Sequence, residues 1–292
     1  MTQLIADRRD PETIRAALSR EYWDAVFDVS GYIMATDAEN FLALLDVLDG
    51  RAGRYVFVSS VMAYAPSGYF PWRETAPVTP DPPSTYGGFK AFAEQAILER
   101  FAASGFAATV ARPAAIYGPE NNIYDMETPM YLRLLQGRPI LLPHGGLVAG
   151  SYGHVDDLCD VMVSMATETR AHGEVFNITA DGLTSQRYVT TLAKIVGVEP
   201  DIVFVPDDVL PTLTTPVFSH LFGVRHHAIA SIDKARSVVG FEPTYDFVGG
   251  HEVTYEWFQA RGWGELREPL VDPMWGASWD FDAEATLAAR LR

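Results

Sequence analysis

Three polar residues in the first hundred positions have the types and the spacing of a proton-transfer group. Tyr86 and Lys90 stand four residues apart in the segment Tyr86-Gly-Gly-Phe-Lys90, and Ser60 closes an apolar run 26 residues before Tyr86. Positions i and i+4 of a helix share one face, so Tyr86 and Lys90 are expected to point the same way. An ammonium beside a phenol favours the phenolate, which predicts a lowered pKa for Tyr86 and a role as general acid or base.

Ser60 is predicted to complete this group. It ends the run Arg54-Tyr-Val-Phe-Val-Ser-Ser60, which reads as a strand, and open α/β sheets bind ligands at the carboxyl ends of their strands. Its hydroxyl is then placed to hydrogen-bond the same substrate oxygen and to stabilise developing charge. The alternative interpretation is an aromatic ring stacked on a lysine stem along an exposed helix. The chain has only three lysines, so a chance Tyr–Lys pair at this spacing is uncommon.

The elements that position these residues follow from alternating apolar and amphipathic runs. The first half predicts strands at 2–6, 24–30, 55–59 and 107–111, and helices at about 11–20, 40–50 and 84–103. The second half predicts helices at 126–136, 156–167, 186–196, 231–240 and 249–260, and strands at 139–142, 174–178 and 201–205. Strand–helix alternation implies parallel strands with right-handed crossovers. The predicted fold class is therefore α/β, with a Rossmann-like doubly wound parallel sheet.

Two domains and a tail are expected. Residues 1–125, with about 153–180, form the Rossmann-like core. Residues 126–152 and 181–262 form a smaller substrate-binding lobe, because the strand–helix pattern loosens there, and residues 263–292 form a polar C-terminal tail.

The composition narrows the range of partners. The net charge of −16, with no dense basic patch, repels phosphate backbones, so nucleic acid is not an expected partner. No run reaches the roughly 18 apolar residues of a membrane span, so no membrane partner is expected. Cys159 is the only cysteine, which suits the cytoplasm. The adjacent pair His226-His227 lacks partners at ligand spacing, so no metal site is predicted.

Five motifs resemble, in order, those of the extended short-chain dehydrogenase/reductase superfamily, the NAD-dependent epimerase/dehydratase family. They are a serine strand at 58–64, a Tyr-x-x-x-Lys pair at 86–90, an Arg-Pro…Tyr-Gly-Pro segment at 111–119, a His-Val-x-Asp-Leu element at 153–158 and a Phe-Asn-Ile strand at 175–178. Two further runs, 24–31 and 226–235, resemble the atypical branch that includes chloroplast stem-loop-binding proteins. Some members of that branch bind or cleave RNA, a role against which the net charge of −16 argues here.

The resemblance implies a role for each member of the group. In the family the tyrosine is the acid/base, the lysine steadies it and the nicotinamide ribose, and the serine orients the substrate oxygen. These roles fall here on Tyr86, Lys90 and Ser60.

The resemblance also implies a cofactor, NAD or NADP. The matching positions are Asp7 at the adenine, Ser30 and Gly31 beside the ribose, and Pro113 and Ile116 near the carboxamide. Tyr86 and Lys90 are counted among the cofactor contacts as well.

The chain departs from the family at its beginning. The family opens with a strand, a Gly-x-x-Gly-x-x-Gly turn, a helix and a second strand, whereas Met1 already matches the start of the third strand. The expected fold is therefore N-terminally truncated and lacks the loop that would hold the pyrophosphate at a helix N-terminus. Three explanations stay open: a wrong start in a longer protein, a genuine loss of dinucleotide binding, or a missing half supplied by another chain. Binding of the cofactor by this chain is accordingly in question.

Four residues are predicted as weaker substrate contacts. Tyr64 and Tyr117 have side chains that line sugar or aromatic pockets, and Arg133 and Arg225 have side chains that hold phosphates or carboxylates. Core packing and structural ion pairing are the alternatives for these residue types. In relatives the matching helices form a homodimer bundle, so a homodimer is expected through the apolar stripe Phe41, Leu45, Phe92, Ile97 and Phe101.

Two functions are compatible with these residues. The first is an NAD(P)-dependent epimerase, dehydratase or reductase that acts on a hydroxyl or carbonyl of a small polar substrate, for instance a sugar nucleotide. The alternative is a cofactor-free relative that serves as a binding or regulatory module or performs non-redox acid/base chemistry. The residues name neither the substrate nor the reaction type, and those that distinguish NAD from NADP belong to the missing second strand.

Overall fold

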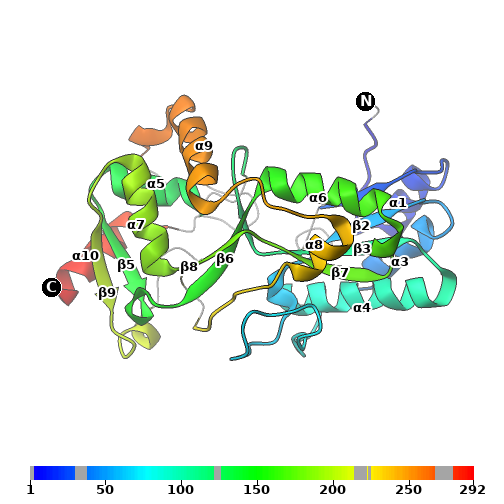
Figure 1. The fold of residues 1–292 in the computed structure, drawn as a ribbon, viewed down its shortest axis with the longest axis horizontal. Coiled ribbons are helices and arrows are strands. Elements are labelled where there is room, and N and C mark those ends of the chain that lie inside the picture. The colour runs from blue at the N-terminus through cyan, green and yellow to red at the C-terminus, as the bar shows by residue number, and fades with distance from the viewer. Residues whose placement is uncertain (1–2, 30–37, 122–125, 214–221, 223–224, 267–278) are drawn as a thin grey trace. The chain divides into compact units, whose positions relative to one another are not determined.

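The computed structural model describes residues 3–29, 38–121, 126–213, 222, 225–266 and 279–292 (Figure 1). Its contacts divide the chain into two compact units. Unit 1 comprises Met1–Ala114, Leu158–Ile178 and Ala230–Glu242, and unit 2 comprises Ala115–Asp157, Thr179–Ile229 and Pro243–Arg292. Unit 1 thus includes Ala230–Glu242, a segment that the sequence pattern assigns to the substrate-binding lobe.

Unit 1 is built on a four-stranded parallel sheet. The strands are β1 (Val26–Asp28), β2 (Tyr55–Val58), β3 (Ala108–Pro113) and β7 (Glu174–Ile178), in the spatial order β1-β2-β3-β7. In register, Phe57 pairs with Val110, and Val110 pairs with Val175. The central strand β3 is buried along its whole length, as expected of a parallel strand that is covered on both faces.

Helices cover both faces of this sheet. Three of them, α1 (Pro11–Leu18), α3 (Ala38–Leu48) and α4 (Tyr86–Ser104), pack their apolar side chains against β2 and β3 in one continuous core. In Figure 1, α4 runs along one side of the strands and α6 (Val155–Thr167) along the opposite side. The short helices η3 (Thr169–Ala171) and α8 (Asp233–Val239) pack against β7. The expected α/β fold with a doubly wound parallel sheet is confirmed.

The strand expected at residues 2–6 is wrong, since the described residues 3–10 form no strand. Side chains hold this segment beside α1 and β1 instead. The Asp7 backbone N–H donates to Thr13 Oγ1 at 3.1 Å, and the Arg8 guanidinium binds the Asp28 carboxylate through bonds of 2.6 and 2.8 Å. Asp28 also accepts a bond from the Tyr55 hydroxyl at 2.7 Å, so the segment is fixed to the sheet by polar side chains rather than by strand pairing.

Unit 2 contains two small sheets and a helical core. Its strands are β4 (Ala115–Tyr117), β5 (Pro139–Pro143), β6 (Ala149–His154), β8 (Asp181–Thr184) and β9 (Asp201–Val205). Strand β6 pairs in parallel with β4 and antiparallel with β8, and β5 pairs in parallel with β9. The helices are η2 (His144–Gly146), α5 (Glu127–Leu135), α7 (Ser185–Val196), η4 (Leu210–Thr212), α9 (Phe247–Ala260), η6 (Trp263–Glu265) and α10 (Phe281–Leu291).

Candidate active site

Ser60, Tyr86 and Lys90 lie together in unit 1. Tyr86 is the first residue of α4, because the side chain of Thr85 caps the helix by accepting a hydrogen bond from the Gly88 N–H at 3.1 Å. Lys90 follows one turn later, with its Nζ 5.6 Å from the centroid of the Tyr86 ring. Ser60 lies close enough to Tyr86 for hydrogen bonding between the two side chains to act on the pKa of Tyr86, in the lowering direction. The structure therefore brings the three residues together, as their spacing predicts.

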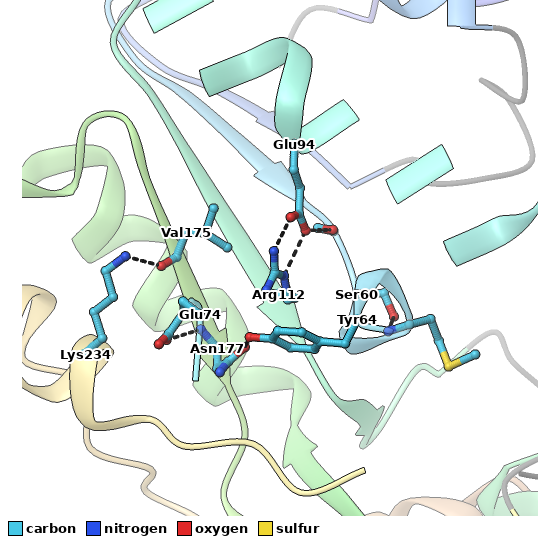
Figure 2. Close-up of polar contacts among 10 residues, drawn as sticks. Ser60, Tyr64, Glu74, Glu94, Arg112, Val175, Asn177 and Lys234 are labelled. Atoms are coloured by element: carbon cyan, nitrogen blue, oxygen red, sulfur yellow. Dashed lines mark hydrogen bonds and ion pairs between the residues drawn. The ribbon is translucent and has the colours of Figure 1, made fainter. Parts of the chain in front are cut away.

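Ser60 is held by a short turn at the carboxyl end of β2. The turn is η1 (Val61–Ala63), and Ser60 caps it by accepting a hydrogen bond from the Met62 N–H at 3.1 Å (Figure 2). Tyr64 closes the turn, since its N–H donates to the Val61 carbonyl. The serine hydroxyl is therefore fixed by the local backbone and faces the first turn of α4.

Gly87 allows α4 to approach this turn. A Cβ at position 87 would lie 2.3 Å from the carbonyl oxygen of Met62, which is backbone and cannot rotate out of the way. Only glycine permits this close contact between two backbone segments. The sequence pattern did not single out Gly87, because the contact depends on a turn that is 25 residues away in the chain.

Replacing Gly87 with alanine is expected to lower the free energy of unfolding by about 1–3 kcal/mol, because the added methyl group overlaps backbone. This loss outweighs the gain of about 1 kcal/mol that alanine brings to an open helical position. Gly68→Ala is the matched control, since a Cβ at Gly68 has no atom within 4 Å. Urea unfolding measures both variants, and equal stability of the two would contradict the close approach of α4 and η1.

Burial raises the pKa of Tyr86 above its ordinary value, and the hydrogen bond with Ser60 opposes this only in part. The expectation of a lowered pKa is wrong in this structure. Lys90 directs its ammonium toward the backbone, where Nζ donates to the Val58 carbonyl oxygen at 2.7 Å, rather than toward the phenol oxygen. Tyr86 is therefore a neutral phenol at physiological pH, which suits the donation of a proton to a substrate oxygen.

Lys90 is an unusual lysine for a folded protein. It is 2% exposed, and among the described residues no carboxylate lies within 4 Å of its Nζ. Burial lowers its pKa to about 8. The aromatic ring of Phe57, 4.9 Å from Nζ, and the Val58 carbonyl provide partial compensation. Two of the three ammonium N–H groups have no partner within the described part of the chain, so they are available to hydroxyl groups of a ligand.

A buried polar network lies next to Ser60, Tyr86 and Lys90. The spacing of the motif did not predict it. Glu94, one turn after Lys90 on α4, accepts a hydrogen bond from Arg112 Nε at 3.0 Å and pairs with Arg112 Nη2 as well (Figure 2). Ser59 donates to the same carboxylate. Both charges of the ion pair are almost completely buried, at 3% and 2% exposure. The position of Glu94, four residues after Lys90, could have indicated that it lies on the same helix face. Its pairing with Arg112 on β3 was not predictable from the sequence.

The other residues of unit 1 that were expected to contact the cofactor are Asp7, Pro113, Ser30 and Gly31. Asp7 is partly exposed, and its carboxylate accepts hydrogen bonds from the Arg9 side chain and backbone, which lower the pKa of Asp7 to about 2. Pro113 is buried at the carboxyl end of β3. Ser30 and Gly31 lie outside the described residues.

The remaining expected contacts belong to unit 2. Ile116 is partly buried in β4, and Arg225 is exposed. Tyr117 is buried, with its ring stacked on His251 at 3.8 Å between centroids. Arg133 is 2% exposed and forms a two-bond ion pair with Glu284, which holds α10 against α5. Its Nε and Nη2 are engaged with that carboxylate, which gives Arg133 a structural contact, and its role in substrate binding stays a prediction.

Tyr64 is buried as well, at 4% exposure. Its hydroxyl donates to Asn177, and its ring packs against Trp72 at 5.2 Å between centroids. Tyr64 is therefore packed within the core of unit 1, and its contact with a substrate stays a prediction.

Among the described residues, no helix is long and apolar enough to cross a membrane. No group of three or more His, Cys, Asp or Glu side chains there is arranged to hold a metal ion.

Comparison with known proteins identifies the family. A profile of the NAD dependent epimerase/dehydratase family matches residues 1–179, which is more than half of the chain. The matched segment contains the parallel sheet of unit 1 together with Ser60, Tyr86 and Lys90. The protein therefore belongs to the NAD dependent epimerase/dehydratase family, as the order of its motifs predicts.

Two curated relatives are similar over most of this chain. The chloroplast stem-loop binding protein of 41 kDa b of Arabidopsis thaliana is 30% identical over 266 residues, which is 89% of this chain and 65% of the relative. The dTDP-glucose 4,6-dehydratase of Streptomyces niveus is 27% identical over 228 residues, which is 76% of this chain and 62% of the relative. The chain thus spans less than two thirds of the length of either protein.

Solved structures share the fold. The RMD protein of Pseudomonas aeruginosa, complexed with NADPH, has a TM-score of 0.72 at 18% identity, covering 89% of this chain and 90% of that one. The UDP-glucose 4-epimerase of Thermotoga maritima, with UDP-glucose, has a TM-score of 0.73 at 23% identity, covering 87% and 83%. At these identities the likeness supports the Rossmann-like architecture alone.

Proposed function

We propose that the protein is an NAD(P)-dependent oxidoreductase of the epimerase, dehydratase or reductase type, acting on a hydroxyl or carbonyl of a small polar substrate. The observation that carries this proposal is Lys90, a buried lysine with a depressed pKa and no carboxylate partner among the described residues, beside a hydrogen-bonded Ser60–Tyr86 pair. Burying an ammonium without a counter-ion is unfavourable, so strongly perturbed groups of this kind are concentrated at functional sites.

Each residue of the group has a distinct task. Tyr86 holds a proton on its phenol oxygen and gives it to, or takes it from, the substrate oxygen. Ser60 donates its hydroxyl hydrogen bond to that same oxygen and stabilises negative charge as it develops. Lys90 offers ribose hydroxyls the two N–H groups that have no partner in the described part of the chain, and it places a positive charge near Tyr86, which favours the phenolate while the proton is away.

The residues present fit a nicotinamide cofactor at this end of the site. Lys90 supplies hydrogen-bond donors that have no partner among the described residues, and Tyr86 supplies a phenol within reach of the same hydroxyls. The bound nicotinamide would accept or return a hydride at the substrate carbon. The described residues contain no strand, Gly-rich turn and helix in succession, so none of them is assigned to the pyrophosphate.

Sugar nucleotides are the first substrates to test, because relatives and structural neighbours include enzymes named for dTDP-glucose and UDP-glucose. The purified chain is incubated with NAD or NADP and a panel of sugar nucleotides, and products are followed by mass spectrometry and by the absorbance of reduced nicotinamide. Conversion that requires the nicotinamide supports the proposal. Conversion of a substrate without any nicotinamide would support the cofactor-free alternative instead.

The homodimer and the cytoplasmic location remain proposals. Phe41, Leu45 and Ile97, expected at the interface, are buried in the core of unit 1. A shallow hollow of about 370 Å³ remains between α3 and α4, with Leu42, 38% exposed, at its edge. This outer surface of the helix pair is the proposed dimer face. A sedimentation mass of twice 32.2 kDa supports the dimer, and a monomer mass contradicts it.

A further inference from the structure

A buried hydrogen-bonded chain begins at the turn that carries Ser60. Tyr64, the last residue of that turn, donates its hydroxyl to Asn177 Oδ1 of β7 at 2.8 Å (Figure 2). The face of the Tyr64 ring lies 4.2 Å from the guanidinium carbon of Arg112. Tyr64 therefore joins the Ser60 turn to two strands, β3 and β7, that are distant in sequence.

Asn177 offers Tyr64 an acceptor whose orientation is fixed. Its Nδ2 donates to the carbonyl oxygens of Trp72 and Ser231, both at 3.1 Å. Its backbone N–H donates to the Glu74 carboxylate at 2.8 Å. Because both amide hydrogens are used, the amide oxygen of Asn177 has one direction in which to point, and that direction is toward the Tyr64 hydroxyl.

The other contact of Tyr64 is equally constrained. Arg112 is held by two bonds to Glu94, a residue of the same helix that carries Tyr86 and Lys90. Planar two-bond pairs of this kind fix the position of a guanidinium as well as its charge. The ring of Tyr64 therefore packs on the Arg112 guanidinium, whose position is set by Glu94 of α4. The turn that carries Ser60 and the helix that carries Tyr86 thus contact the same ion pair.

We propose that Tyr64 is a positioning residue for the catalytic group: it anchors the Ser60–Tyr64 turn to Asn177 and Arg112, so that the Ser60 hydroxyl stays in contact with Tyr86. This inference rests on the proposed function only for its effect on turnover, since the contact itself exists without substrate. The C-terminal end of the turn is held through Tyr64, and its middle, at the Met62 carbonyl, lies against Gly87. Both contacts must be kept for the Ser60 hydroxyl to hold a single direction.

Loss of the Tyr64 hydroxyl has a defined consequence. The turn gains freedom at its C-terminal end, and the hydrogen bond between Ser60 and Tyr86 forms for a smaller fraction of the time. That bond is what opposes the effect of burial on Tyr86, so the pKa of Tyr86 rises further when it weakens. Turnover falls by about tenfold while KM stays within about twofold, because the lost alignment acts mainly in the transition state.

The test uses Tyr64→Phe in the full chain, which retains the ring over Arg112. Tyrosine labelled with carbon-13 at Cζ is incorporated, the Tyr86 resonance is assigned with Tyr86→Phe, and alkaline titration is stopped before circular dichroism reports unfolding. In Tyr64→Phe the Tyr86 resonance is expected to keep its neutral-form shift to higher pH than in the wild type. Ser60→Ala is expected to give the same change, and the double variant no further change.

The control is Thr109→Val, which removes another buried hydroxyl bond of unit 1, from Thr109 Oγ1 to the Ala171 carbonyl at 2.9 Å. It is expected to lower stability as much as Tyr64→Phe does, without moving the Tyr86 titration. Asn177→Ala removes the acceptor of the Tyr64 hydroxyl and is used in place of Tyr64→Phe if the Tyr64→Phe protein fails to fold. It is expected to shift the Tyr86 titration in the same direction.

A Tyr86 titration that moves in Ser60→Ala but is unchanged in Tyr64→Phe or Asn177→Ala would overturn the positioning role. The titrations need no substrate, so their result is valid even if the protein turns over none of the substrates tested. Failure of the proposed function is therefore distinguishable from failure of this inference.

Discussion

Replacing Tyr86 with phenylalanine is expected to lower kcat by about a hundredfold or more, the usual contribution of a positioned proton donor. The substitution removes only the phenol oxygen, so the ring that lies 5.6 Å from Lys90 Nζ is retained. That oxygen is the proposed donor and acceptor of the proton of the substrate. KM is expected to change little, because the lost interaction involves the reacting oxygen rather than the rest of the substrate.

Tyr69→Phe is the matched control for this variant. Tyr69 is 90% exposed and lies outside the catalytic group, so its loss of a hydroxyl should leave kcat unchanged. The two proteins are compared for conversion of the same sugar nucleotide at saturating nicotinamide cofactor. Turnover by Tyr86→Phe at the rate of Tyr69→Phe would remove Tyr86 from the mechanism.

Replacing Lys90 with methionine is expected to make the protein more stable and less able to bind the nicotinamide nucleotide. Burial lowers the pKa of Lys90 from 10.5 to about 8, which at about 1.4 kcal/mol for each pKa unit corresponds to about 3 kcal/mol. The lost hydrogen bond to Val58 offsets about 1 kcal/mol of that amount. The net gain in the free energy of unfolding at pH 7 is therefore about 2 kcal/mol.

The stability difference between the wild type and Lys90→Met is expected to depend on pH. The folded state binds the Lys90 proton less tightly than the unfolded state does, so below pH 8 the buried ammonium destabilises the fold by its full amount. As pH rises from about 8 to 10.5, the folded protein loses this proton first and the destabilisation disappears. The wild type should therefore gain about 3 kcal/mol relative to Lys90→Met across that interval, so the order of stability reverses below pH 10.5 and the wild type ends about 1 kcal/mol more stable, the contribution of the hydrogen bond to Val58.

Lys234→Met is the control, since Lys234 makes nearly the same local contacts without a neighbouring Ser–Tyr pair. Its Nζ donates to the Val175 carbonyl at 2.8 Å (Figure 2). The same Nζ lies 5.0 Å from the centroid of the Phe176 ring. It also forms an ion pair with Glu174 at 2.6 Å and is 30% exposed. Its removal is expected to be neutral or slightly destabilising. Urea unfolding at pH 7 in which Lys90→Met is less stable than Lys234→Met would contradict the account of Lys90.

The sequence was sufficient to predict the sheet and the proximity of Ser60, Tyr86 and Lys90, because both depend on local patterns. The helix spacing of Tyr86 and Lys90 and the strand that ends before Ser60 are short-range features, and the structure keeps them together. The sign of the Tyr86 pKa was not predictable, because it depends on how deeply the phenol is buried and on the direction of the Lys90 ammonium. Both are properties of packing rather than of spacing.

Long-range pairing accounts for the other differences. Tyr64 and Arg133 have residue types suited to ligand binding, but Asn177 and Glu284, more than a hundred positions away in the chain, bind them within the core. The segment 3–10 has the apolar start of a strand, yet Arg8 is bound to Asp28 and the segment forms no strand. In each case one charged or polar partner, distant in sequence, determined the outcome.

The most direct test of the central claim is a fluorescence titration of the 292-residue chain with NADH and with NADPH, repeated for Lys90→Met and Lys234→Met. The account predicts saturable binding of at least one nucleotide by the wild type and by Lys234→Met. It predicts binding that is at least about tenfold weaker for Lys90→Met, as expected when charge-assisted hydrogen bonds to a ribose are lost. A folded chain that binds neither nucleotide, or a Lys90→Met protein that binds as tightly as Lys234→Met, would contradict it.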